Sequence, residues 1–515
     1  MCIRDRHRAW QNTREKKAEG IEMADILNVL YLTSEVFPFS KTGGLADVSH
    51  FLPLALRDLG FNILVVTPRY RDITPDRYAM QRLDVSLRVP MFFWDEQAAV
   101  YQHMLGNRVP VFFIEHNAFF DRPGIYNENH TDYPDNLKRY AFLTRAALQL
   151  ARLFAFKVDI VHANDWQTAL APMYIKMAYN HDPLLAAAGS LLTIHNLGYQ
   201  GLFAKESIYD TGFGWDLFKP EFLEYYDQIN LLKGGIQFAD IINTVSRRYA
   251  HEIQTPQFGF HLDGVLRSRS TDLYGIVNGA DYDHWNPETD RLIPAVFSRD
   301  DLSGKQICKQ ALQQRFHLQQ RPGAPVIGVV SRLVRQKGFD LLAQVLDTLM
   351  EHDVQLAILG TGESWANDFF YHLPGRYPGR VGSMITYDEQ LAHLVEAGAD
   401  FFLMPSRYEP CGLNQMYSLR YGTLPIVRAT GGLDDTIDDY HETHGLGTGF
   451  KFYPFSPEAL LDVLKKVIYT WWDRKHHIQA MRKRAMAQRF SWAHTAEEYL
   501  KLYAFAKEKK LKGWY

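Results

Sequence analysis

The sequence is poor in cysteine, in long apolar runs and in excess charge of either sign. Its 515 residues include three cysteines. These are too few and too scattered for a disulfide framework or a cysteine-rich zinc site, so we expect a reducing, cytoplasmic setting. No apolar run approaches the roughly 18 residues of a membrane-spanning helix, which favours a soluble protein without a membrane partner. The 56 basic and 59 acidic residues give a formal charge of −3, and this balance does not favour a nucleic-acid partner.

The length of the chain and the composition of its first residues limit the number and extent of its domains. At roughly 100–200 residues per domain, 515 residues predict two or three domains with a large buried core. Residues 1–22 are strongly polar and show neither the apolar segment of a signal peptide nor a core-forming period. We interpret them as a disordered or non-native leader and exclude them from the fold.

Short β-rich apolar runs alternate with longer amphipathic stretches in two successive sets. This alternation is typical of parallel sheets covered by helices on both faces, so we predict an α/β fold with two Rossmann-like, doubly wound domains. We predict an N-terminal domain at 23–275, a C-terminal domain at 276–494 and a helix at 495–515 that packs back towards the first domain. The apolar runs lie at 28–32, 62–66, 158–161, 190–194 and 240–245, then at 274–277, 325–330, 355–359, 400–404 and 424–427.

The fold class predicts where a ligand binds. Open parallel sheets bind ligands beyond the carboxyl ends of their strands, so we expect an active site in an interdomain cleft. The segments that follow the predicted strands are therefore the candidates for ligand-binding residues.

Residues 40–48 form a glycine-containing corner between a predicted strand and a predicted helix. Gly43 and Gly44 allow close approach of the backbone to an anion, and Lys41 adds a compact positive charge, which suits a diphosphate. An ordinary strand–turn–helix corner is the alternative. The segment is not a Walker A loop, because the lysine precedes the glycines.

Residues 331–338 follow another predicted strand and carry two cations. Arg332 at the strand end and Lys337 at the entry to the next helix can neutralise one anion without a metal. Solvated surface charges explain the pattern equally well.

Residues 405–415 place Glu409 in a proline-flanked turn between a strand and a helix. A carboxylate there, followed by backbone N–H groups, can bind sugar hydroxyls and phosphate oxygens together. A further glycine corner at 430–433 repeats the arrangement after the next strand. Several such corners in one chain favour a phosphate-containing ligand.

Polar side chains also follow two neighbouring strands of the first set, in segments 162–167 and 195–201. Asp165 and His195 belong to these segments, and short polar groups at adjacent strand ends suit a sugar pocket. A packed, hydrogen-bonded histidine is the alternative interpretation.

Three other patterns do not support a metal site, a dinucleotide cofactor or a hydrolase. The carboxylates at 281–283 lie in a turn-rich segment, where such residues serve turns, so we predict no metal. The glycines at 445–449 and 360–362 are incomplete dinucleotide fingerprints, so we expect no cofactor. The chain also lacks the Gly-x-Ser-x-Gly elbow of many hydrolases.

In chain order, the motifs KTGGLADV, HNLGYQG, SRLVRQKG, PSRYEPCGLNQ and TGGLDDT closely resemble those of bacterial glycogen synthases and plant starch synthases. The resemblance covers residues 24 to about 505. It implies a retaining glucosyltransferase of the GT-B fold that moves glucose from ADP-glucose to the non-reducing end of an α-1,4-glucan such as glycogen. It further implies a cytoplasmic location, or a plastid one in a plant or alga.

The resemblance assigns roles on the phosphate side of the donor. It implies that Lys41, Arg332 and Lys337 contact the diphosphate and that Asp47 shapes the donor loop. Glu409 then binds the glucosyl hydroxyls. The other implied contacts in this part of the substrate site are Gly43, Gly44, Cys411, Gly412, Leu413, Thr430, Gly431 and Gly432.

On the sugar and base side, the resemblance implies that Asp165, His195 and Asn278 face the transferred sugar. Tyr387 matches an aromatic residue that stacks on the nucleotide base. Tyr126 completes the implied substrate-binding set.

Two positions depart from related enzymes, and three alternatives stay open. Tyr417 stands where the wider retaining class often has a second glutamate, and Gln167 stands where some relatives have histidine. We therefore favour a same-face reaction in which the leaving phosphate takes the acceptor's proton. UDP-glucose as donor, a different acceptor, or a non-catalytic glucan-binding role are the alternatives.

Overall fold

The computed structural model describes residues 26–129 and 131–513, which form two compact units. Unit 1 comprises the chain up to Asn243, Phe260–Tyr274 and the segment from Ala493 onward, and unit 2 comprises Thr244–Gly259 and Gly275–Trp492. The predicted leader, 1–22, lies outside the described residues.

Unit 1 is built on a nine-stranded sheet with the order β14-β13-β9-β8-β1-β2-β5-β4-β3. The strands β1, β2, β5, β8 and β9 pair in parallel, whereas β3 and β4 continue the sheet as antiparallel strands at one edge. The central strand is almost wholly buried, as a strand covered on both faces must be. The sheet strands are β1 (Asn28–Leu32), β2 (Asn62–Pro68), β3 (Gln81–Pro90), β4 (Asp95–Leu105), β5 (Val109–Glu115), β8 (Ile160–Asn164), β9 (Gly189–Ile194), β13 (Ile241–Thr244) and β14 (Leu273–Gly275).

Helices and short hairpins complete unit 1. The hairpin strands are β6 (Asn127–Glu128), β7 (Thr131–Asp132), β10 (Leu202–Ala204), β11 (Glu224–Tyr225) and β12 (Gln228–Asn230). The helices are α2 (Gly44–Asp58), α3 (Asn117–Phe120), α4 (Asn136–Leu153), α5 (Asp165–Thr168), α6 (Ala171–Met173), η1 (Tyr174–Ala178), η2 (Lys205–Thr211), η3 (Trp215–Leu217), α7 (Leu231–Phe238), α9 (Asp263–Ser268) and α18 (Trp492–Lys512).

The C-terminal helix α18 packs on the sheet of unit 1. The hydroxyl of Tyr503 lies 2.9 Å from Nδ1 of His162, and the hydroxyl of Tyr499 accepts a hydrogen bond from Asn243. A Cβ atom on Gly189 would lie 2.8 Å from the helix backbone. This close approach explains why a glycine begins β9.

Unit 2 is built on a six-stranded parallel sheet with the order β17-β16-β15-β18-β19-β20. The strands are β15 (Val326–Val330), β16 (Gln355–Leu359), β17 (Val381–Met384), β18 (Phe401–Met404), β19 (Leu424–Arg428) and β20 (Phe450–Phe452). The helices are α8 (Arg247–Glu252), α10 (Ser303–Arg315), η4 (Arg335–Lys337), α11 (Phe339–Leu349), α12 (Ser364–Arg376), α13 (Glu389–Gly398), α14 (Asn414–Arg420), α15 (Gly431–Thr436), α16 (Pro457–Asp473) and α17 (Lys475–Ala487).

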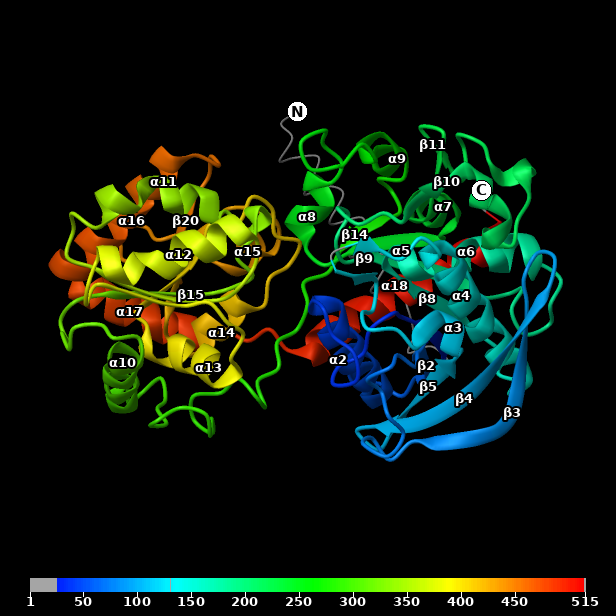
Figure 1. The fold of residues 1–515 in the computed structure, drawn as a ribbon, viewed down its shortest axis with the longest axis horizontal. Helices are drawn as coiled ribbons and strands as arrows, with labels where there is room; N and C mark the ends of the chain where they lie inside the picture. The colour runs from blue at the N-terminus through cyan, green and yellow to red at the C-terminus, as the bar shows by residue number, and fades with distance from the viewer. Residues whose placement is uncertain (1–25, 130, 514–515) are drawn as a thin grey trace. The chain divides into compact units, whose positions relative to one another are not determined.

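The sheet of unit 2 carries a separate apolar core on each face. One core contains side chains of α11, α12 and α16, and the other contains side chains of α10 and α13. Figure 1 shows α11, α12 and α16 on one side of β15 and α13 on the other. Helices on both faces of a parallel sheet define a doubly wound domain, so the predicted α/β fold class is confirmed.

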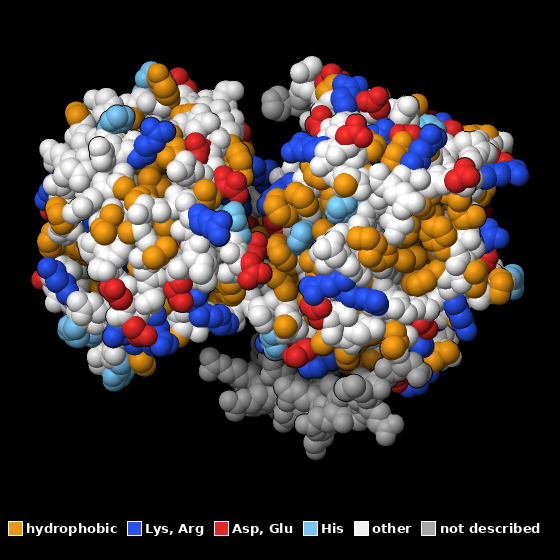
Figure 2. All heavy atoms as spheres, turned by 90° about the horizontal axis from the view of Figure 1, so that it is seen from below, with side chains coloured by type: hydrophobic (Ala, Val, Ile, Leu, Met, Phe, Trp, Pro, Cys, Tyr) orange, Lys and Arg blue, Asp and Glu red, His pale blue; other side chains and the backbone are white. Residues whose placement is uncertain are grey.

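The surface carries charges of both signs. Basic, acidic and apolar side chains are interspersed over the face shown in Figure 2, in keeping with the formal charge of −3. Within residues 26–129 and 131–513, no helix combines the length and the apolar character needed to cross a membrane.

Candidate functional site

The strand order of unit 2 fixes where its ligand site lies. The chain runs outward from β15 to β16 and β17, then returns to β18 and runs outward in the other direction to β19 and β20. The topological switch point is therefore between β15 and β18, whose carboxyl ends lie side by side. Ligands of open α/β sheets bind beyond the carboxyl ends at such a point.

A cavity of about 190 Å³ opens at this switch point. Arg332 and Lys337 line it together with residues 403–406 and 412–414. The predicted segments 331–338 and 405–415 therefore meet at one cavity.

Glu409 and Lys337 form an ion pair beside this cavity. Lys337 Nζ lies 2.6 Å from Glu409 Oε2, and the Ser406 hydroxyl donates to the same oxygen at 2.9 Å. The carboxylate is 5% exposed, so it depends on these two donors to compensate its lost hydration. Sequence reasoning missed Ser406, although it precedes Glu409 in the same turn.

Glycine lets the two loops approach each other. Gly338 has φ +76°, and a Cβ atom on it would lie 1.9 Å from the carbonyl oxygen of Pro405. Any other residue would push the lysine-bearing turn away from the turn that carries Glu409. The glycine after Lys337 is thus required for the ion pair.

The glycine corner at 430–432 packs against the backbone of the turn that carries Glu409. Gly431 has φ +47°, and a Cβ atom there would lie 1.8 Å from the carbonyl oxygen of Glu409. Glu252 accepts hydrogen bonds from the Thr430 hydroxyl at 3.0 Å and from the Gly431 N–H at 3.1 Å. A carboxylate of the chain itself therefore occupies this corner, and sequence reasoning gave no signal for it.

Residues 412–414, which directly follow Cys411, line the same cavity. Gly412 has φ +76°, and the Asn414 side chain donates to the carbonyl of Val330 at 2.9 Å, which ties α14 to the end of β15. Leu413 precedes the first residue of α14. Burial raises the pKa of the Cys411 thiol to about 12, so this group stays protonated.

Asn278 and Tyr387 differ in exposure. Asn278 is buried, and its Oδ1 atom accepts no hydrogen bond from any residue that the structure describes. Tyr387 is 84% exposed and directly precedes Asp388, which caps α13 through a hydrogen bond to the Leu391 N–H. An exposed ring at this position is available for stacking.

The switch point of unit 1 lies between β1 and β8, and Asp165 stands at its edge. Its Oδ1 atom accepts the His195 N–H at 2.6 Å and the Asn196 N–H at 3.4 Å, which joins the ends of β8 and β9. Asp165 has φ +53°, a strained value for a residue with a side chain. Burial raises the pKa of its carboxyl to about 7.

His195 is held as a neutral imidazole. Burial lowers its pKa to about 3. Its Nε2 atom lies 2.9 Å from Asn164 Oδ1, while the Asn164 amide donates to the carbonyl of Leu32. Because Asn164 Oδ1 can only accept, Nε2 carries the proton and Nδ1 carries the lone pair.

Glu35, which sequence reasoning missed, organises the loop before α2. It is buried, and it accepts hydrogen bonds from the Tyr126 hydroxyl at 2.6 Å and the Thr42 hydroxyl at 2.7 Å. The Thr42 N–H donates to its second oxygen. Burial raises the pKa of Tyr126 well above its usual value, so its hydroxyl remains a donor. Tyr126 thereby acts on the predicted corner through Glu35.

The glycine pair in that corner faces open space. Lys41 is half-exposed and pairs with Asp47 at 2.7 Å. A Cβ atom on Gly43 or Gly44 would meet no described atom within 4 Å. Packing therefore does not require glycine here, in contrast to Gly431.

The two departures from related enzymes lie in packed surroundings. Tyr417 stacks on Trp285 with ring centroids 4.5 Å apart. Gln167 is buried, and its Oε1 atom has no partner among the described residues.

Comparison with known proteins assigns most of the chain to two families. Residues 28–268 match the starch synthase catalytic domain, and residues 311–484 match glycosyl transferases group 1. Glycogen synthase 1 of Geobacter sulfurreducens is 47% identical over 487 residues, which cover 94% of this chain and 97% of that protein. The catalytic domain of starch synthase IV from Arabidopsis thaliana, bound to ADP and acarbose, is 31% identical with a TM-score of 0.86. The match covers 94% of this chain and 100% of that chain. Sucrose-phosphate synthase from Thermosynechococcus elongatus shares the fold. It is 16% identical with a TM-score of 0.57, and the match covers 93% of this chain and 98% of that chain.

Proposed function

The chain belongs to the glycogen and starch synthase family, and we propose from that premise that it lengthens α-1,4-glucans with glucose taken from ADP-glucose. The resemblance found in the sequence is confirmed, and the two α/β units are the Rossmann-like domains of a GT-B glycosyltransferase. The chain is thus a glucan-extending glucosyltransferase. The choice of ADP-glucose over UDP-glucose is the proposed part.

One observation supports the proposed donor site most strongly. Arg332 and the Lys337–Glu409 pair lie at one cavity at the switch point of unit 2. Two cations and one carboxylate there match a donor that has an anionic diphosphate and a hydroxyl-rich sugar. We assign the diphosphate to Arg332 and Lys337, and the glucosyl hydroxyls to Glu409.

The chemistry proposed for this cavity is electrostatic. Breaking the bond between glucose and the diphosphate develops negative charge on the phosphate oxygens, which fixed cations stabilise more strongly in the transition state than in the ground state. The backbone N–H groups at 412–414 provide further donors beside Lys337. Removal of one such preorganised donor typically costs about 10²–10³ in kcat.

We assign Asp165 and His195 to contacts with the transferred glucosyl group. In its ionised form, Asp165 stabilises positive charge that develops on the glucosyl ring, while Nδ1 of the neutral His195 accepts a hydrogen bond from a sugar hydroxyl. We keep the same-face mechanism, in which the leaving phosphate takes the acceptor's proton.

The remaining predicted residues have supporting roles in the proposal. Lys41 contacts the diphosphate, the open space at Gly43 and Gly44 admits it, and Asn278 and Tyr387 contact sugar and base. Gly431, with Gly432 and Thr430, acts by holding the Glu409 turn. Both described cysteines, Cys308 and Cys411, are free thiols, which supports a cytoplasmic location.

The direct test offers ADP-glucose and UDP-glucose in parallel, each with a maltooligosaccharide, and measures chain extension. We expect faster extension with ADP-glucose. Faster extension with UDP-glucose would reverse the donor assignment. Donor turnover without growth of the chain would point to a different acceptor, and an absence of turnover to a glucan-binding protein.

A further inference from the structure

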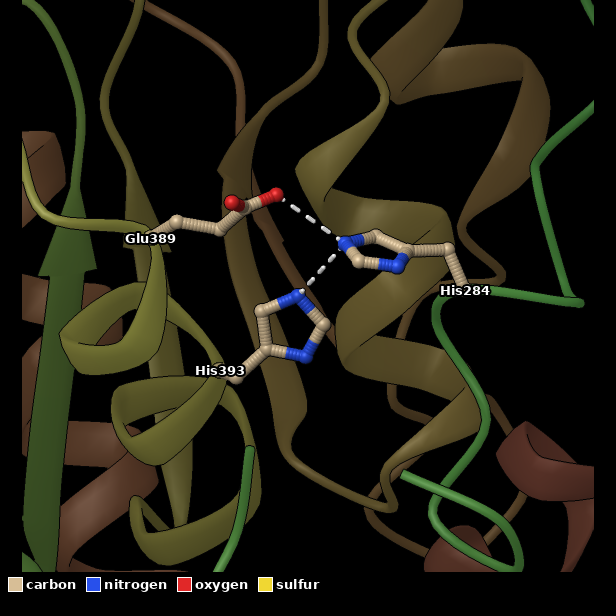
Figure 3. Close-up of side chains that lie close together, drawn as sticks. All are labelled: His284, Glu389 and His393. Carbon is tan, nitrogen blue, oxygen red and sulfur yellow. Dashed lines mark hydrogen bonds and ion pairs between the residues drawn. The ribbon is translucent and has the colours of Figure 1, made fainter. Parts of the chain in front are cut away.

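Three side chains with metal-binding groups converge in unit 2, and none of them lines the donor cavity. Glu389 and His393 are four residues apart in α13 and so lie on one face of the helix. His284 reaches them from the segment that precedes α10. Figure 3 shows the three side chains pointing at one another.

The distances between the three groups suit a metal ion. His284 Nε2 lies 3.0 Å from Glu389 Oε1 and 3.2 Å from His393 Nε2, and all three ligand atoms lie within 4.8 Å of one another. Metal–ligand bonds of about 2.0–2.1 Å in a tetrahedron separate the ligand atoms by about 3.3 Å. Two imidazole nitrogens and one carboxylate oxygen are ligands typical of zinc.

A carboxylate behind His393 fixes the imidazole in the form that binds metal. Asp290 Oδ2 lies 2.7 Å from His393 Nδ1 and also accepts the Tyr421 hydroxyl at 2.5 Å. One oxygen of Asp290 therefore faces both the Tyr421 hydroxyl, which donates to it, and His393 Nδ1. This contact places the proton of the imidazole on Nδ1 and leaves the lone pair on Nε2. Such a carboxylate–histidine pair is the usual support of a zinc ligand.

Hydrogen bonds alone do not satisfy His284, Glu389 and His393. His284 Nε2 carries at most one proton, yet it faces two acceptors, Glu389 Oε1 and the lone pair of His393 Nε2. One of the two contacts therefore lacks a proton. A cation between the three atoms satisfies all of them at once.

The surroundings hold two of the ligands in place and leave one side open. Trp285 stacks on His393 at 3.7 Å, and the His284 N–H donates to Asp281 at 3.2 Å. His393 is fully buried, whereas the side chains of His284 and Glu389 are 45% and 58% exposed. An ion can thus enter from solvent and keep a water molecule as its fourth ligand.

We propose that His284, Glu389 and His393 bind one divalent transition-metal ion, with zinc as the best match. The ion would tie the first two turns of α13 to the segment before α10. It would therefore stabilise unit 2 where these two segments meet.

The test uses the full chain, freed of any affinity tag and stripped of metal with a chelator. Co²⁺ serves as a spectroscopic probe, and Zn²⁺ binding is measured by calorimetry and by thermal unfolding. The variants His284→Ala and Glu389→Gln change exposed ligands and should leave the fold intact. The control is His372→Ala, because His372 lies 3.4 Å from Asp368 on α12, also four residues apart, as an exposed pair.

We expect one equivalent of Co²⁺ to bind with visible ligand-field absorption, and one equivalent of Zn²⁺ to raise the unfolding temperature. Each ligand variant should weaken binding by about 10–100-fold or more, and Asp290→Asn by about 10–100-fold. The His372 variant should bind like the unchanged chain. Absence of saturable binding at one equivalent, or binding that survives both ligand variants, would overturn the proposal.

Discussion

Replacing Lys337 by alanine tests the electrostatic role proposed for the cavity. The variant removes a cation that lines the cavity and leaves Glu409, 5% exposed, with Ser406 as its remaining side-chain donor. For catalysis, the loss of one preorganised donor predicts a fall of about 10²–10³ in kcat, or about 3–4 kcal/mol. The KM for ADP-glucose should change by only a few-fold, because the effect lies mainly in the transition state.

The same variant also affects stability, and the two effects can be separated. Breaking a buried pair costs about 3–5 kcal/mol. The side chain of Lys337 is 20% exposed, so we expect a smaller loss, about 1–3 kcal/mol, in the free energy of unfolding by urea. Adding Glu409→Gln should restore much of this stability, because it removes the stranded charge, but it should not restore kcat.

Lys309→Met provides the matched control. Lys309 forms a buried ion pair with Asp400 at 2.6 Å in the same unit. Asp400 directly precedes β18, at the end of the strand opposite the cavity. The control should lower stability and keep kcat. Equal effects on kcat and KM in Lys337→Ala, or recovery of kcat in the double variant, would refute transition-state stabilisation by Lys337.

Three further predictions follow from individual residues. Gly43→Ala should keep the free energy of unfolding but lower kcat/KM. Gly431→Ala should lower the free energy of unfolding by about 2 kcal/mol or more, because its Cβ would overlap the Glu409 carbonyl. Equal urea midpoints for the two variants would contradict this. Since burial raises the pKa of Asp165 to about 7, kcat/KM should rise with pH through about 7, and a pH profile of Asp165→Asn that keeps this step would exclude Asp165 as its source. Burial raises the pKa of Glu396 to about 8, so the folded state keeps a proton that the unfolded state loses above its ordinary pKa of about 4.3. Stability should therefore fall by up to about 1.4 kcal/mol per pH unit between those values, and Glu396→Gln should flatten the fall in urea titrations at several pH values; parallel curves would argue against it.

The sequence predicted the elements that carry a local signal. Parallel strands buried on both faces appear as short apolar runs, and the polar or glycine-rich segments that follow them mark the carboxyl edge of the sheet. Arg332, Lys337 and Glu409 were predicted in this way, and the structure places the first two in the lining of one cavity, with Glu409 paired to Lys337. Strands β3, β4 and β5 were missed. Strand β3 alternates exposed polar residues with more buried ones at the edge of the sheet, whereas β5 is a mostly buried apolar run that carries the same local signal as the predicted strands.

Groups that act through distant partners could not be predicted. Glu35 lies close in sequence to the corner that it organises, but its contact with Tyr126 spans 91 residues. Glu252 meets Thr430 across 178 residues, and His284 meets Glu389 across 105. Such pairs exist only once the strands are ordered in the sheet, which periodicity does not reveal.

The central claim is that the cavity at the β15–β18 switch point holds the donor's diphosphate. A crystal structure of the chain with ADP tests it most directly. We expect diphosphate oxygens within about 3 Å of Lys337 Nζ and the Arg332 guanidinium, with the backbone at 412–414 beside them. A diphosphate bound elsewhere, with both cations turned to solvent, would contradict it.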